Sequence, residues 1–172
     1  LATLGCLLNQ VESRELGARL EGRGFRVVEP EAAAQVYVIN TCTVTGRADF
    51  SDRQLIRRVA RENPDAYLVV TGCYAQTDPR AVAAIAGVDL VVGNQEKYRL
   101  PELLGSLTRR ARPEVAVADI GGAREIPIVP VVPGVGRSRG FVKIQDGCQH
   151  RCAFCIVPAA RGRSRSQEPK VA

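Results

Sequence analysis

Histidine and lysine are scarce in this chain of 172 residues, which has one histidine, and only three lysines among its 24 lysine and arginine residues. Arginine therefore supplies most of the positive charge, and the net charge is +6. Such a surplus suits an anionic partner such as RNA, although an arginine-rich genome would produce the same surplus. The charge alone leaves both explanations open.

Long apolar runs are also missing. No stretch approaches the roughly 20 apolar residues of a membrane span, and no charged and then apolar leader precedes the first predicted strand. We therefore expect a cytoplasmic protein with no membrane partner. The chain begins with Leu1 rather than Met and ends at Ala172, soon after a cysteine motif, so we expect it to be a piece of a longer protein.

A fourth cysteine is absent from the motif "DGCQHRCAFC", which contains Cys148, Cys152 and Cys155. Six cysteines in a chain without a secretory leader are typical of metal ligands or redox groups rather than disulfides. A closed structural zinc site needs four protein ligands, and the only histidine, His150, lies within this motif, where the simplest interpretation is a loop residue. The motif therefore predicts a metal site with one open position.

Strands and helices alternate along the first hundred residues. Short apolar runs such as "VYVIN" are typical of buried strands, and the segments between them carry apolar residues at helical spacing. This alternation indicates βαβ crossovers, so we predict an α/β fold with a flavodoxin-like parallel sheet and flanking helices. The predicted strands are residues 1–6, 36–40, 67–73 and 89–93.

Helix boundaries are predicted from residues that favour helix starts. Ser51 or Asp49 is expected to cap the helix that precedes the third strand. Asp78 followed by Pro79 is expected to open the next one.

The chain is predicted to have three parts. Residues 1–107 form the sheet domain, and residues 108–139 are a proline-, glycine- and arginine-rich connection in which "EVAVA" could form an edge strand. Residues 140–172 open a second domain with a strand at "GFVKIQDG" (140–147), which leads into Cys148.

Cys6 and Cys73 stand at the ends of predicted strands, and Cys42 lies two residues after the end of another. The carboxyl ends of parallel strands share one edge of the sheet, and neighbouring strands are about 4.8 Å apart. If the first strand lies between the second and third, as in flavodoxin-like sheets, the three thiols converge at one crevice. A single cysteine in such a place is more often a small buried hydrophobic residue. Three at matching positions favour an iron–sulfur site, because soft thiolates suit such clusters.

The spacing Cys148-x3-Cys152-x2-Cys155, with Phe154 before the last cysteine, is similar to the signature of radical S-adenosylmethionine (SAM) enzymes. Together with "LGCLLNQVES", "VINTCTVT", "VTGCYAQ", "VVGNQEK" and "IVPAARGRSRS", it makes the chain resemble the methylthiotransferase family. The resemblance covers nearly the whole chain apart from the connection, and its blocks occur in the expected order.

The resemblance implies two [4Fe–4S] clusters and SAM as cofactors. Cys148, Cys152 and Cys155 would hold one cluster and leave its fourth iron open for SAM, whose reductive cleavage gives a 5′-deoxyadenosyl radical. Phe154 would pack near the adenine of SAM. The catalytic role of the motif is then to place SAM on the open iron.

The resemblance also implies that Cys6, Cys42 and Cys73 hold an auxiliary cluster, whose open iron would carry the sulfur to be inserted. The net change would replace C–H by C–SCH3. Residues 140–172 would begin a partial α/β barrel that is truncated here, so we expect this chain alone to be inactive. Further partners implied are tRNA and an electron donor of the flavodoxin or ferredoxin type, with no role for DNA.

The family acts on three kinds of substrate, and "IVPAARGRSRS" is most similar to the branch that modifies threonylcarbamoyladenosine at carbon 2 in tRNA. Isopentenyladenosine in tRNA and an aspartate of a ribosomal protein are the alternatives, because this chain has Leu7 or Leu8 where that branch commonly has lysine, and Ala159 where it often has an aromatic residue. A basic run at the same place, formed by Arg161, Arg163 and Arg165, could contact RNA phosphates or could be a solvated loop.

Two alternatives without enzymatic activity remain. One is a flavodoxin-like binding module with incidental cysteines, which leaves the motif at Cys148 unexplained. The other is a zinc protein that binds RNA through its arginines. Metal analysis distinguishes them, because the methylthiotransferase interpretation predicts iron and sulfide rather than zinc.

Overall fold

A parallel sheet of five strands organises the first 116 residues of the computed structural model, which describes residues 1–105, 107–126, 141–150, 152–168 and 170. The central strands are mostly buried, as parallel strands between helices usually are, whereas the first and last strands, at the two edges of the sheet, are more exposed. The strands are β1 (Ala2–Thr3), β2 (Val36–Thr41), β3 (Tyr67–Gly72), β4 (Leu90–Val92) and β5 (Glu114–Ala116). The predicted α/β class is confirmed.

The strands lie in chain order, β1-β2-β3-β4-β5, and every pairing is parallel. The predicted position of the first strand, between the second and third, is therefore wrong. Instead, β2 lies between β1 and β3, because it pairs with β3 along its whole length and with β1 at Ala2↔Ile39 and Thr3↔Asn40. All carboxyl ends still meet at one edge, because all strands point the same way.

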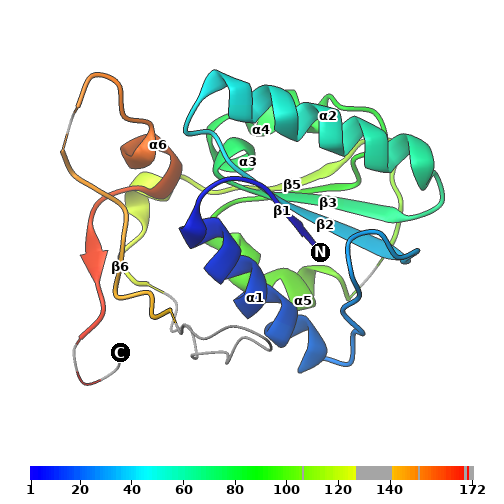
Figure 1. Cartoon of the computed structure of the whole chain (residues 1–172), viewed down its shortest axis with the longest axis horizontal. Coiled ribbons are helices and arrows are strands. Elements are labelled where there is room, and N and C mark those ends of the chain that lie inside the picture. Colours follow the sequence, from blue (N-terminus) through cyan, green and yellow to red (C-terminus); the bar gives the residue numbers. More distant parts are fainter. Residues whose placement is uncertain (106, 127–140, 151, 169, 171–172) are drawn as a thin grey trace.

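Helices cover both faces of the sheet. In Figure 1, α1 and α5 lie on one face and α2 and α4 on the other. Alternate residues of β3 serve the two sides: Leu68 and Val70 pack in the cluster with Ile56 of α2, whereas Val69 packs in the cluster with Leu16 of α1. The helical elements of this part are α1 (Leu7–Glu21), α2 (Gly46–Glu62), α3 (Cys73–Thr77), α4 (Pro79–Ala83), η1 (Glu96–Arg99) and α5 (Leu100–Leu103).

Thr45, rather than Ser51 or Asp49, caps α2. Its side-chain oxygen accepts a hydrogen bond from the backbone N–H of Ala48 at 3.1 Å. The helix therefore begins one turn earlier than predicted, and Ser51 donates to the carbonyl of Arg47 inside it. The cap predicted at Asp78 is confirmed, since its carboxylate accepts from the N–H of Ala81 at 3.0 Å.

The later part of the chain lies beside the carboxyl ends of the strands (Figure 1). It contains η2 (Ile120–Gly122), β6 (Gln145–Asp146), α6 (Val157–Arg161) and β7 (Arg165–Ser166). α6 packs against α3 and η2, and β6 pairs antiparallel with β7. Within the predicted connection 108–139, the structure places β5 and η2, while residues 127–140 lie outside the described residues. The strand predicted at 140–147 is limited to β6.

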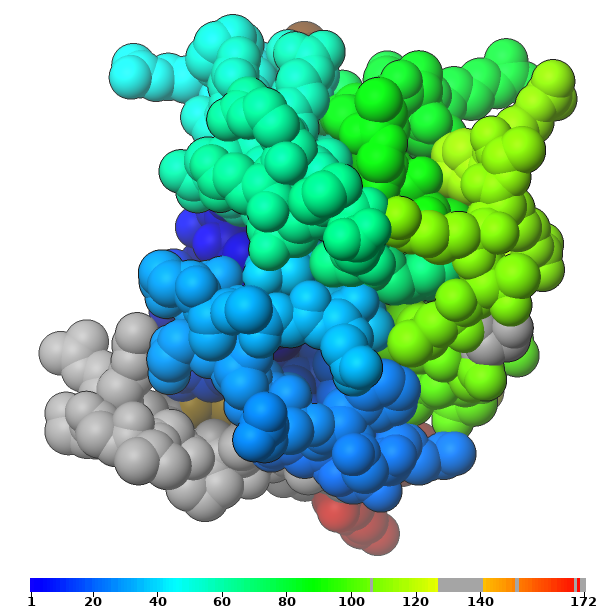
Figure 2. Space-filling model, turned by 90° about the vertical axis from the view of Figure 1, so that its right-hand side faces the viewer, coloured from blue at the N-terminus to red at the C-terminus, as the bar shows by residue number. Residues whose placement is uncertain are grey.

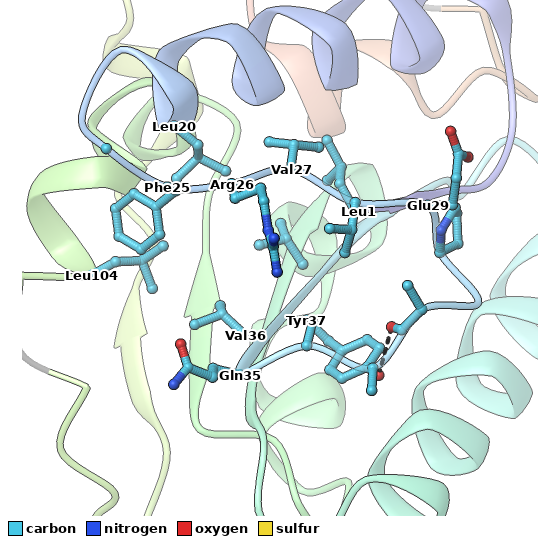
Figure 3. A pocket seen from close by; sticks show the side chains of 17 residues that line it. Leu1, Leu20, Phe25, Arg26, Val27, Glu29, Gln35, Val36, Tyr37 and Leu104 are labelled. Atoms are coloured by element: carbon cyan, nitrogen blue, oxygen red, sulfur yellow. Dashed lines mark hydrogen bonds between the residues drawn. The ribbon is translucent and has the colours of Figure 1, made fainter.

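A cavity of about 560 Å³ lies at the opposite end of the sheet, between the segment from Gly24 to Glu29 and the beginning of β2. Figure 2 shows this face, and Figure 3 shows Leu1, Val27 and Val36 lining the cavity. The Tyr37 hydroxyl donates to the carbonyl of Ala32 at 3.1 Å across its rim (Figure 3). Because Cys42 follows the other end of β2, this cavity is separate from the cysteines. Among the described residues, no helix is both long and apolar enough to cross a membrane.

Candidate metal centre

Cys6, Cys42 and Cys73 line one cavity of about 190 Å³ at the carboxyl edge of the sheet. Cys6 stands at the N-terminal boundary of α1, Cys42 directly follows β2, and Cys73 is the first residue of α3. Cys42 and Cys73 are buried, whereas Cys6 is exposed. The structure therefore brings the three predicted ligands of the first group together, although the strand order differs from the one predicted.

Two glycines allow this approach. Gly5 has a φ of +97°, and a Cβ at this position would meet the Cβ and Sγ atoms of Cys42, the latter at 2.5 Å. Gly72 has a φ of +98°, and a Cβ there would meet the backbone of Thr41. Only glycine adopts such a φ without strain. Gly5 therefore lets the backbone before Cys6 approach Cys42, and Gly72 lets the backbone before Cys73 approach Thr41.

The spacing of the thiols bears on what they could bind. Among the residues that the structure describes, no three Cys, His, Asp or Glu side chains form a group that could hold a single metal ion. In an iron–sulfur cluster each thiolate binds a different iron, so the sulfurs surround the group rather than one atom. Three cysteines around a shared cavity fit that chemistry.

Polar groups at the back of the cavity act on Cys73. Burial raises the pKa of its thiol, while the nearby charges of Arg161 and Lys97 oppose this rise. The Asn94 amide donates to the Cys73 sulfur at 3.8 Å and to the carbonyl of Ala160 at 2.7 Å. A metal bound to the thiolate would displace the proton that burial favours.

The second motif lies next to this cavity. Its flanking residues Gly147, Ile156 and Val157 line the cavity together with the first three cysteines. Two backbone bonds shape the loop: the N–H of Cys148 donates to the carbonyl of Gly162 at 3.0 Å, and that of Cys155 to the carbonyl of Cys152 at 3.1 Å.

The motif itself is open to solvent. Cys152 is exposed, and Cys148 and Cys155 are partly exposed. The Phe154 side chain is 93% exposed, so the proposed contact with an adenine ring stays a prediction.

Two of the three predicted phosphate-binding arginines are buried. The Arg161 guanidinium donates to both carboxylate oxygens of Glu12 at 2.8 and 2.9 Å, and to Asn9 Oδ1 at 2.9 Å. Arg165 donates to the carbonyl of Arg161 at 2.6 Å. Protein acceptors occupy the Arg161 guanidinium, whereas Nε and Nη1 of Arg165 are buried without a hydrogen-bond partner among the described residues. Burial of both guanidinium groups argues against the predicted phosphate contacts of Arg161 and Arg165. Arg163 is exposed and remains a candidate.

A buried charge cluster that the sequence did not predict surrounds Glu12. We call it the Glu12 cluster, and it consists of Glu12, Lys97, Lys143, Asp146 and Arg161, all at most 7% exposed. Lys97 Nζ and Lys143 Nζ each lie 2.7 Å from a Glu12 oxygen, and Lys143 Nζ also lies 2.7 Å from Asp146 Oδ2. Burial alone would raise the pKa of Glu12, but the adjoining cations hold it well below its usual range. The only feature of the sequence that points to this cluster is the scarcity of lysine, since two of the three lysines belong to the cluster.

Asp52 is a second buried carboxyl beside the cysteines. Its Oδ2 accepts the backbone N–H of Cys42 at 2.9 Å, and its Oδ1 is buried without a hydrogen-bond partner among the described residues. Burial raises the pKa of Asp52 to about 7. This carboxyl therefore helps to fix the backbone at Cys42.

Residues 1–93 match the model of the family described as uncharacterized protein family UPF0004. The chain belongs to this family. The matched region contains Cys6, Cys42 and Cys73 but ends before the second motif. The family assignment therefore rests on the part of the chain that builds the sheet and its thiol cavity.

Relatives of this UPF0004 chain carry methylthiotransferase names. It is 42% identical over 168 residues to the threonylcarbamoyladenosine tRNA methylthiotransferase MtaB of Bacillus subtilis, with 98% of this chain and 37% of that protein covered. It is 43% identical over 164 residues to the protein of the same name from Aquifex aeolicus, with 95% and 40% covered.

A relative with another substrate name is also similar. The ribosomal protein uS12 methylthiotransferase RimO of Roseiflexus is 34% identical over 192 residues, with 97% of this chain and 39% of that protein covered. The chain spans about two fifths of the length of these relatives.

Proposed function

We propose that this chain is part of a tRNA methylthiotransferase that replaces C–H at carbon 2 of threonylcarbamoyladenosine with C–SCH3. The observation that carries the proposal is the cavity that Cys6, Cys42 and Cys73 line together with residues beside the second cysteine motif. The relatives named for this substrate, at 42% and 43% identity, support the choice of substrate. The relative named for a ribosomal protein makes that substrate the principal alternative.

The two cysteine groups would hold two [4Fe–4S] clusters, one at Cys6, Cys42 and Cys73 and the other at Cys148, Cys152 and Cys155. When bound, these clusters and SAM would supply the sulfur and the radical chemistry of the reaction. The chain's own contribution is placement. Parallel strands deliver the first three thiols to one edge, and the contact of Arg161 with Glu12 holds the end of α6 against α1.

The proposed division of the chain follows from these roles. Residues 1–107 would carry the first cluster, residues 108–139 would connect, and residues 140–172 would begin the radical SAM domain. Gly147 and Val157 line the thiol cavity together with the first three cysteines. This shared lining supports a functional contact between residues 1–107 and residues 140–172.

Mass spectrometry of tRNA nucleosides tests the proposal. A bacterial strain that lacks this gene is complemented with the complete gene or with its Cys42→Ala variant. The complete gene is expected to restore the methylthio form of threonylcarbamoyladenosine, and the Cys42→Ala variant is expected not to. If the dimethylallyl- or isopentenyl-type nucleoside changes instead, the substrate assignment is wrong.

A second measurement separates the roles of the two cysteine groups. In the complete protein, Cys152→Ala is expected to abolish reductive SAM cleavage, whereas Cys42→Ala is expected to retain it while losing the methylthio product. A Cys42→Ala protein that forms the product at the unchanged rate would refute the first group as the sulfur site.

A further inference from the structure

Positive charge is in surplus inside the protein next to the thiol cavity. The Glu12 cluster contains three cations and two carboxylates, and the buried Arg165 lies beside it, 3.7 Å from Asp146. Together these six residues have two more positive than negative charges. The next carboxylate on α1, Glu15, is bonded to Arg19. Burying unbalanced charge costs several kcal/mol per ion, so a buried surplus of this kind calls for an anion close by.

The surplus adjoins the three thiols directly. Arg161 and Asp146 line the same cavity as Cys6, Cys42 and Cys73. Asn94 connects the two sets, because its Oδ1 accepts from Lys97 Nζ at 2.8 Å and its amide donates to the Cys73 sulfur.

A group held by three thiolates would be the required anion. The thiolate charges outweigh the positive charge of an iron–sulfur core, and one-electron reduction adds a further negative charge. Nearby charges and hydrogen bonds to the sulfurs set the reduction potential of such clusters. Cations beside the cavity favour the reduced form, and the carboxylates oppose it.

We propose that the Glu12 cluster sets the reduction potential of the iron–sulfur group at Cys6, Cys42 and Cys73, with Arg161 as its principal positioning residue. This inference rests on the proposed function. Arg161 is the cation of the cluster that lines the thiol cavity, and it also contacts both carboxylates of the cluster. The same contacts join the segment after the second motif to the helix that follows Cys6.

A potentiometric titration followed by electron paramagnetic resonance tests the proposal. In the parent protein Cys148, Cys152 and Cys155 are replaced by Ala, so that only the first group is loaded with ferrous iron and sulfide without oxygen. Arg161→Gln removes a positive charge and is expected to lower the midpoint potential. Glu12→Gln removes a negative charge and is expected to raise it.

The opposite signs distinguish an electrostatic role from a structural one, because loss of structure alone gives no reason for the two variants to shift oppositely. Arg161→Lys keeps the charge and is expected to stay nearer to the parent potential than Arg161→Gln does. Arg23→Gln and Glu102→Gln remove the same charges from an exposed pair and are expected to cause no shift. Circular dichroism checks that each variant is folded.

A second pair of variants covers the case in which Glu12→Gln fails to fold. Lys143→Gln is expected to lower the potential, and Asp146→Asn is expected to raise it. Shifts of one sign throughout, or no shift at the buried positions, would overturn the inference while leaving the proposed function intact. A parent protein that binds no iron–sulfur group would instead overturn both.

Discussion

Glycine, as much as cysteine, builds the thiol cavity. Gly5 and Gly72 each precede a cysteine and adopt a positive φ, and neither position has room for a Cβ. The pattern is visible in the sequence as "LGC" and "TGC", whereas the contact of Gly5 with Cys42 is visible only in the structure. A cysteine that follows a glycine can thus be recognised in the sequence as a candidate metal ligand. The residue against which the glycine packs cannot be recognised in this way.

Gly5→Ala is expected to separate Cys6 from Cys42, because the added Cβ meets the Cys42 side chain at a φ of +97°. The strain should lower the free energy of unfolding by about 1–3 kcal/mol. It should also reduce the iron bound at the first cysteine group, measured in protein lacking the second group. Gly46→Ala is the control, because a Cβ at Gly46 meets no atom within 4 Å. Equal iron content in both variants would contradict this role of Gly5.

Asp52 gives the stability of the metal-free protein a pH dependence. Its pKa is raised from 3.8 to about 7 in the folded chain, so the folded state retains a proton that the unfolded state loses. The contribution of Asp52 therefore falls as pH rises from about 4 to about 7, by at most about 4 kcal/mol. Urea unfolding across this range should show a shallower decline for Asp52→Asn. The exposed Asp65→Asn should retain the full decline, and an unchanged slope in Asp52→Asn would contradict the assignment.

Elements are predicted more reliably than their arrangement. Local patterns identified all five strands, because short apolar runs marked β1 to β4 and the edge strand expected at "EVAVA" is confirmed as β5. The order of the strands depends on which edges meet, and nothing in the local pattern of β1 fixes its neighbour. The start of α2 was placed too late because Ser51 and Asp49 are also good capping residues, and Thr45 lies outside the apolar stripe.

Thr45→Ala removes the side chain that caps α2 and is expected to lower the free energy of unfolding by about 1 kcal/mol. Ser51→Ala, inside the same helix, is expected to change it by less than about 0.5 kcal/mol. Urea denaturation of both variants measures the difference. A larger loss of unfolding free energy for Ser51→Ala than for Thr45→Ala would contradict the cap at Thr45 and favour the cap predicted from the sequence.

At the scale of the whole molecule, buried charges that lie far apart in the chain join the later segment to the sheet domain. Arg161 and Glu12 are separated by 149 positions, and a glutamate on a helix is ordinarily exposed, so no local pattern predicts that the two pair. The buried face of α1 explains its weak apolar pattern, because Asn9, Glu12 and Ser13 share it with Leu16. Such long-range ion pairs can be recognised only from the structure, in which the later segment packs against the sheet domain.

Glu12→Ala is expected to loosen the segment from 141 to 168, because it leaves Lys97, Lys143 and Arg161 without their shared carboxylate. Breaking a buried ion pair costs about 3–5 kcal/mol. Hydrogen exchange should accelerate at the amides of Cys148 and Gly162, whose N–H groups are bonded within this segment. Glu102→Ala breaks an exposed ion pair with Arg23 and should cost at most about 1 kcal/mol, with no change in exchange. Equal effects of the two variants would contradict the account.

The iron and sulfide content of the chain lacking Cys148, Cys152 and Cys155 tests most directly whether the other three thiols share one iron–sulfur group. After anaerobic reconstitution we predict about four iron and four sulfide per chain, and the loss of most of both when Cys42 is also replaced by Ala. Zinc in place of iron, or an iron content that the Cys42 variant leaves unchanged, would contradict the account.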